Sequence, residues 1–304
     1  MRKNPVLGLF YALLATATWG TLPIIAQPIL SVMNAQTFVW YRFMIAGLGL
    51  FFFFVLTKRL PTASAFTPRI IKLIILGVIG LAGNFFLFSE ALNYISPTTN
   101  QVLWQLAPFT MILCGVLIFK EKFGFHQKMG LILLVGGLLA FFNEKMAEIF
   151  QFGSYALGII IAASAAIIWV CYGIAQKLLL QTFTSQQILL IIYLGCTLVL
   201  MPFTTPSQLF ELKGFLLGSF IYCCMNTLIG YGAYAEALNH WDATKVSVIT
   251  ILLPVFTMLF SHLGHYFFPT TFAELKMNGL SYLGAFIVVT GSLLSAIGHK
   301  IFNR

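Results

Sequence analysis

The sequence predicts an all-α polytopic membrane protein whose ten transmembrane helices form two inverted five-helix repeats. Three observations predict this fold class. First, 60% of the 304 residues are hydrophobic and only 8% are charged, with a mean hydropathy of +0.94, which excludes a soluble globular domain. Second, ten apolar stretches are long enough to cross a bilayer as helices. Third, landmarks of the first half of the chain recur in the second half.

The ten stretches approach or exceed the roughly 20 residues that a helix needs to cross the bilayer core. The first follows Arg2 and Lys3 but continues through Trp19 without a small-residue cleavage site, so we expect a retained helix and not a signal peptide. The fifth is short, and the ninth is long enough to tilt or to break at Pro254. In chain order the stretches are residues 6–26, 35–57, 70–92, 97–119, 128–143, 153–176, 185–204, 213–238, 243–268 and 278–298.

The positive charges fall mainly on one side of the predicted membrane. If the N-terminus is cytoplasmic, thirteen Lys and Arg residues lie on the cytoplasmic side and only Lys145, Lys213 and Lys276 lie on the other. Cytoplasmic loops carry the excess of positive charge in membrane proteins. We therefore expect a multi-pass protein of the cell (inner) membrane with both termini in the cytoplasm. This topology accounts for the net charge of +9 without a nucleic-acid partner.

One short run of residues occurs twice. Residues 90–93 and 236–239 both read Glu-Ala-Leu-Asn, 146 residues apart, and Pro108 and Pro254 follow at the same offset. Small residues and tryptophans repeat too, at offsets of 150 and 154 residues, and small residues at every fourth position favour close packing between helices. The matched pairs are Gly8 and Gly158, Ala12 and Ala162, Trp19 and Trp169, Gly130 and Gly284, and Gly137 and Gly291.

The repeat has a consequence for mechanism. A five-span unit that starts in the cytoplasm must be followed by a copy that starts outside, so the units 1–149 and 150–304 are predicted to be inverted. Inverted repeats can exchange conformations and move an opening from one side of the membrane to the other. The sequence therefore predicts transport by alternating access.

The chain resembles the drug/metabolite transporter superfamily, specifically its ten-span EamA-type branch. The resemblance covers essentially the whole chain and rests on residues 17–20 (Ala-Thr-Trp-Gly), residues 41–43 (Tyr-Arg-Phe), both prolines, Glu121 after the fourth span and the paired glycines. It implies a cavity lined by spans 1, 3, 4, 6, 8 and 9, and export or exchange of small metabolites. The chain departs from the family pattern at the repeat-equivalent of Glu121, which is about Phe267.

Two glutamates and one arginine are the candidate gating or coupling residues. Ionisable groups within membrane segments usually have a partner, a proton or access to water. Glu90 and Glu236 lie near opposite faces of the membrane in the inverted arrangement, so we expect two separate gates or coupling sites. The alternative is a structural role at the neighbouring helix starts, 96–98 and 242–245. Arg42 is predicted to reach the headgroups or to pair with Glu90, and could instead hold a substrate carboxylate.

The polar face of span 4 is the first part of the candidate substrate site. Gln101, Trp104, Gln105 and Pro108 share one helix face. Amides facing lipid would be unsatisfied, so this face should point inward. Thr250 lies on the equivalent face of span 9. The prolines are expected to break both helices, and interrupted helices are where transporter sites form. The alternative for the glutamines is hydrogen bonding between helices.

Aromatic and amide side chains complete the candidate site. Aromatic walls suit flat or cationic groups, and asparagines in spans 3 and 8 could face a cavity or join helices. Trp40, Tyr41 and Tyr193 could be interfacial anchors instead. The remaining candidates for substrate binding are Trp19, Asn84, Trp169, Tyr172, Asn226, Tyr231 and Tyr234.

These features predict a secondary-active or facilitative transporter, an exporter or exchanger of a small metabolite such as an amino acid or related amine. The alternatives are a channel or structural subunit; a membrane enzyme is disfavoured because the few ionisable residues are dispersed. His262 and His265 have no nearby acidic or cysteine partner, so we expect neither a metal nor a cofactor. Expected partners are the small-molecule substrate, membrane lipid and protons, with the protein a monomer or homodimer.

Overall fold

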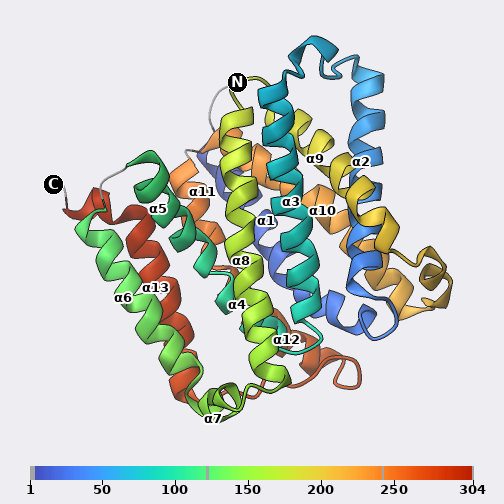
Figure 1. Cartoon of the computed structure of the whole chain (residues 1–304). Helices are drawn as coiled ribbons and strands as arrows, with labels where there is room; N and C mark the ends of the chain where they lie inside the picture. The colour runs from blue at the N-terminus through green and yellow to red at the C-terminus, as the bar shows by residue number, and fades with distance from the viewer. Residues whose placement is uncertain (1–3, 121–122, 242, 303–304) are drawn as a thin grey trace.

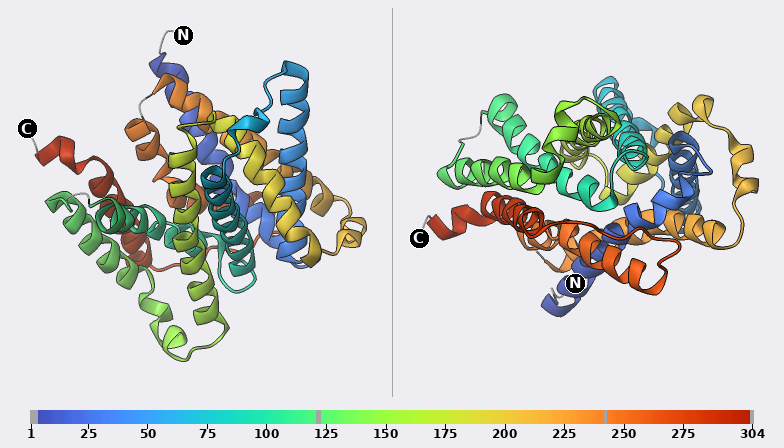
Figure 2. Two further views of the ribbon diagram at one scale, coloured as in Figure 1. Left: turned by 45° about the horizontal axis from the view of Figure 1, so that its top comes forward. Right: turned by 90° about the horizontal axis from the view of Figure 1, so that it is seen from below.

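The computed structural model describes residues 4–120, 123–241 and 243–302, and within these ranges every regular element is a helix. The start of the first helix and the end of the last helix lie on the upper side of the bundle in Figure 1, whereas α7 lies on the lower side; Figure 2 gives two further views. The first half contains α1 (Pro5–Ile29), α2 (Ala35–Thr57), α3 (Pro68–Ala91), α4 (Pro97–Leu103), α5 (Leu106–Phe119), α6 (Phe125–Phe141) and α7 (Met146–Phe150). The second half contains α8 (Ser154–Leu179), α9 (Ser185–Leu200), α10 (Phe215–His240), α11 (Ala243–Thr250), α12 (Leu253–Phe267) and α13 (Gly279–Phe302).

The described helices account for the predicted membrane spans. Nine spans are long and apolar enough to cross a membrane, counting the pairs α4–α5 and α11–α12 as one span each. The tenth is α6, whose 17 residues continue through a bend of 57° into residues 143–150. The predicted fold class, an all-α polytopic membrane protein, is confirmed.

The helix starts follow from local sequence. Each orphan N–H group at a helix start needs an acceptor, which a Ser, Thr or Asn side chain supplies, and proline suits the first turn because its missing N–H has no helical partner there. Prolines open α1, α3 and α4. The side chains that cap the membrane helices are Asn4, Asn34, Thr67, Ser96 and Thr184.

Helices of the two halves pair in a two-fold pattern. If each helix is replaced by its counterpart in the other half of the chain, the pair α3–α8 becomes the pair α1–α10, and both pairs pack extensively. The pairs α2–α9 and α6–α13 each join a helix to its own counterpart. Gly8 of α1 lies against Trp241, as its repeat-equivalent Gly158 of α8 lies against Tyr94 and Ile95. The proposed unit boundary at 149/150 falls in α7, and Glu121 and Asp242 lie outside the described residues.

Glycines bring α6 and α13 into backbone contact. The two helices lie side by side in Figures 1 and 2. A Cβ atom at Gly137 would lie 2.8 Å from the Val288 nitrogen and 2.9 Å from the Gly284 oxygen. A Cβ atom at Gly291 would lie 2.7 Å from the Gly130 oxygen. Small residues therefore set the distance between these helices, as the repeated glycines predict.

The α6–α13 contact can be tested with neighbouring glycines. Gly137→Ala places a methyl group against backbone atoms of α13, which cannot move away as a flexible side chain could. We therefore expect a loss of about 1–3 kcal/mol in unfolding free energy. Gly136→Ala is the matched control, because a Cβ atom there meets nothing within 4 Å; it should be neutral or slightly stabilising. Thermal unfolding in detergent measures both variants. Equal destabilisation by the two substitutions would contradict the packing described.

Candidate functional site

The fourth and ninth spans are interrupted where they meet at the centre of the bundle. α4 ends at Leu103 and α11 at Thr250, and each break lies about one turn before a proline, Pro108 or Pro254. Proline lacks the N–H group that would bond to the carbonyl four residues earlier. The two breaks contact each other, because Gln105 Nε2 donates a 3.0 Å hydrogen bond to the Ile251 oxygen. These two residues are 146 apart, the offset of the repeat.

α1 is bonded to both interrupted spans. Pro23 within α1 leaves the Trp19 carbonyl without its helical donor, and Gln101 Nε2 of α4 donates to that oxygen at 3.3 Å. Thr257 Oγ1 of α12 donates to the next carbonyl, that of Gly20, at 2.8 Å. Gln101 thus replaces the donor that Pro23 removes, and Thr257 adds a bond between α1 and the ninth span.

The predicted polar site residues take part in bonds between or within helices. Both glutamines are buried, and their amide groups donate to carbonyls of other helices. Asn84 Nδ2 donates to Ala165 in α8 at 2.9 Å, and Asn226 Nδ2 donates to Thr18 in α1 at 2.6 Å. Thr250 Oγ1 donates within its own helix. The amide contacts are therefore hydrogen bonds between helices, as the alternative interpretation of these residues expects. Contact of these residues with a substrate stays a prediction.

One group of predicted aromatic residues lies between α1 and α10. The Trp19 ring lies 5.1 Å from the Tyr231 ring and 5.6 Å from the Tyr234 ring, centroid to centroid. Tyr231 also contacts Tyr193 of α9 at 6.2 Å. Tyr193 is only 1% exposed, so the prediction that it anchors the protein at the membrane interface is wrong.

The second aromatic group joins the break in span 4 to α8. Trp104, beside the break, lies 5.5 Å from Trp169, which lies 6.2 Å from Tyr172. Tyr172 is within electrostatic range of Tyr231 and Tyr234. The two aromatic groups therefore face one region, where α1, α8 and α10 come together with the break.

Arg42 is buried, contrary to the prediction that it reaches the headgroups or pairs with Glu90. The side chain is 3% exposed. Its Nε donates a 3.1 Å hydrogen bond to Thr227 Oγ1 of α10. The guanidinium also lies over the rings of Phe38 and Phe85, 5.4 and 4.8 Å from their centroids. The rotation of α2 turns Arg42 inward, toward the second repeat.

The repeated glutamates lie at the ends of α3 and α10 and are half-buried. Glu90 accepts hydrogen bonds from Asn93 Nδ2 at 3.3 Å and from the Tyr94 hydroxyl at 3.4 Å. Glu236 accepts from Asn239 Nδ2 at 3.3 Å, the equivalent bond. Among the described residues neither glutamate forms an ion pair. Their side chains therefore bond locally, and gating or coupling stays a prediction.

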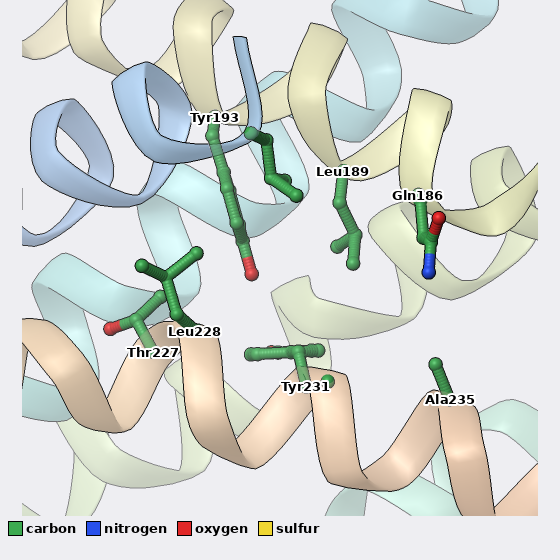
Figure 3. A pocket seen from close by; sticks show the side chains of 9 residues that line it. Gln186, Leu189, Tyr193, Thr227, Leu228, Tyr231 and Ala235 are labelled. Carbon is green, nitrogen blue, oxygen red and sulfur yellow. The ribbon is translucent and has the colours of Figure 1, made fainter. Parts of the chain in front are cut away.

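A small cavity of about 60 Å³ lies between α9 and α10. Figure 3 shows Tyr193 and Leu189 projecting from α9 toward Tyr231 of α10, with Gln186 at one end. Thr227, the partner of Arg42, also lines it. Leu189, Gln186 and Thr227 were not predicted as site residues, because nothing in the sequence pairs α9 with α10.

A second cavity of about 260 Å³ lies on the lower side of the bundle. The end of α1, the start of α4 and the segment 271–275 line it, with Gln27, Ser96, Thr98 and Glu274 among its polar groups. It lies beside the contact between α4 and α12. This cavity is therefore separate from the aromatic region.

The sequence matches the EamA-like transporter family over residues 6–143 and 156–297. The chain belongs to this family. The match spans nearly all of this EamA-like transporter, including every residue of the broken helices and of the aromatic groups.

Similar proteins carry transporter names. An "Uncharacterized transporter" of Haemophilus influenzae is 52% identical, over 99% of this chain and 98% of that protein. The "Uncharacterized inner membrane transporter YhbE" of Escherichia coli K12 is 43% identical, over 100% of this chain and 95% of that protein. A "Probable amino-acid metabolite efflux pump" of Escherichia coli K12 is 22% identical, over 98% and 96%. A solved crystal structure shares the fold, with a TM-score of 0.64 at 16% identity over 99% of this chain and 100% of that one.

The contact between the two breaks can be tested by removing its donor. Gln105→Met keeps the length of the side chain but leaves the Ile251 carbonyl of this EamA-like transporter without its bond. We expect a loss of about 1–3 kcal/mol in unfolding free energy. Gln181→Met, at an exposed position beyond α8, is the control and should change little. Thermal unfolding in detergent gives the comparison, and an unchanged midpoint for Gln105→Met would argue against the bond.

Proposed function

We propose that this EamA-like transporter exports or exchanges a small metabolite, such as an amino acid or related amine, by alternating access. The observation that carries the proposal is the meeting of two interrupted, two-fold-related helices beside a set of aromatic side chains. Interrupted helices at mid-membrane provide exposed backbone groups for ligands. Aromatic rings bind flat or cationic groups by stacking and cation–π attraction.

The packing of the broken spans supports alternating access. On the lower side of Figure 1, α4 packs against α12. α11 and α5 are the counterparts of α4 and α12 in the opposite repeats. They lie on the upper side, and their described residues make no comparable contact with each other. The two repeats therefore have similar helices but different packing contacts. If α11 and α5 came into contact and α4 and α12 separated, the upper side would close and the lower side would open.

The relatives' names support the substrate class and the location. The name of the Escherichia coli amino-acid metabolite efflux pump supports an amino acid or a related metabolite as cargo, and export as the direction. The name of YhbE supports the inner membrane. The excess of Lys and Arg on the side of the termini supports a cytoplasmic location for both ends. We further propose that the protein acts as a monomer or homodimer.

Counterflow in proteoliposomes tests the proposed function. Purified protein is reconstituted in vesicles that are loaded with one unlabelled amino acid or amine at a time, and uptake of the same labelled compound is followed. A transporter exchanges internal for external substrate, so we expect saturable, transient accumulation above the level in protein-free vesicles. Uptake that rises linearly with concentration and shows no counterflow would support a channel. No uptake of any compound would contradict the proposal.

Proton coupling is proposed through Glu90 and Glu236. Glutamine keeps the shape of the side chain but cannot titrate, so Glu90→Gln or Glu236→Gln should reduce accumulation driven by a pH gradient to simple equilibration while leaving counterflow in place. Glu211→Gln is the control, because Glu211 is exposed in a connecting turn. If both variants retain pH-driven accumulation, these glutamates do not couple transport to protons.

A further inference from the structure

Arg42 is the only charged side chain that is buried among the described residues. An arginine keeps its charge in proteins, and a charge within a membrane bundle is costly unless it is compensated. The rings of Phe38 and Phe85 and the single bond to Thr227 supply part of that compensation. Thr227 Oγ1 in turn donates to the Cys223 carbonyl, so it is fixed in place.

The surroundings of Arg42 contain no described carboxylate. Its electrostatic neighbours are Tyr193, Tyr231 and the thiols of Cys223 and Cys224, which are neutral groups. No ion pair joins Arg42 to an acidic side chain within the described ranges, and its only hydrogen bond there uses Nε. The two Nη groups, which form the fork that binds a carboxylate, make no hydrogen bond to described residues.

Two neighbouring buried hydroxyl groups, of which that of Tyr193 is near this arginine, also have no described partner. Tyr172 and Tyr193 are 2% and 1% exposed, and neither hydroxyl makes a hydrogen bond within the described residues. Each lies within electrostatic range of Tyr231, and Tyr193 also of Arg42. A buried hydroxyl group without a hydrogen-bond partner lowers the stability of the fold. These two hydroxyl groups can therefore donate to an acceptor on a ligand.

The cavity in Figure 3 borders the residues around Arg42, although Arg42 and Tyr172 do not themselves line it. It is lined by Tyr193, Tyr231 and Thr227, the residue that holds Arg42. Its volume of about 60 Å³ exceeds the roughly 10–15 Å³ that one water molecule requires. The cavity therefore has room for a group as small as a carboxylate, and the Tyr231 ring that lines it packs against the Trp19 ring.

We propose that Arg42, with the hydroxyl groups of Tyr172 and Tyr193, forms an anion subsite that binds the carboxylate of the transported metabolite. Thr227 is a positioning residue that holds Nε and leaves the Nη groups free. The inference rests on the proposed function and narrows its substrate class: amino acids and other carboxylates are substrates, and amines without a carboxylate are not.

The test compares each L-amino acid with the amine that its decarboxylation gives, for example L-phenylalanine with phenethylamine. Thermal stabilisation of the purified protein and counterflow in proteoliposomes are both measured. We expect amino acids, but not the amines, to stabilise the protein and to be exchanged. Arg42→Gln should raise the half-saturating concentration about 10- to 100-fold, and Tyr193→Phe and Tyr172→Phe about 3- to 10-fold each. Arg42→Lys should fall between wild type and Arg42→Gln, since lysine keeps the charge but not the fork.

Arg69→Gln is the matched control, because Arg69 is exposed at the start of α3, and it should leave binding unchanged. Exchange of amines as well as of amino acids, or unchanged half-saturation in Arg42→Gln, overturns the anion subsite and leaves the proposed transport in place. Loss of stability without ligand in Arg42→Gln, together with unchanged binding in both tyrosine variants, shows a structural role and also overturns it. If no compound stabilises or is exchanged, both proposals fail.

Discussion

The structure depends on the pairing of polar groups where its membrane helices are interrupted. Water is absent from the bilayer interior, so each carbonyl left without a helical donor, at a break or before a proline, needs a donor from the protein. Gln105 supplies one to the Ile251 carbonyl at the break in span 9, and Gln101 supplies another to the Trp19 carbonyl that Pro23 frees in α1. A movement of one repeat against the other must therefore exchange these bonds for others, because leaving them unmade costs about 1–3 kcal/mol each.

The spans and the inverted repeat could be predicted because both depend on patterns in the sequence alone. Apolar length determines which segments cross a bilayer, and recurring landmarks such as Glu90 and Glu236 reveal the doubling without any knowledge of contacts. The sequence also predicts a broken ninth span near Pro254. The helices end about one turn before the prolines because the missing N–H group acts on a carbonyl four residues earlier.

The site was predicted less well, because depth in a span says nothing about rotation or about partners far along the chain. Arg42 was expected near the headgroups, yet its partner Thr227 lies 185 residues away in the second repeat. The inward direction of Gln101 and Gln105 agrees with the argument that amides avoid lipid. Their bonding to carbonyls depends on the packing of α1 against both breaks, which no pattern within one helix records.

The pairing of α1 with α10 has a consequence for biosynthesis. The bond between Asn226 and the Thr18 carbonyl joins residues 208 apart, so α1 enters the bilayer long before the helix that covers it has been made. Until then α1 must persist in the bilayer without its main partner, which its apolar, uncharged sequence allows. α8 is different, since α3 is already in place when α8 emerges. The first repeat therefore cannot reach its final packing before the second repeat is made. The first five spans are fully packed only when the last five have entered the bilayer.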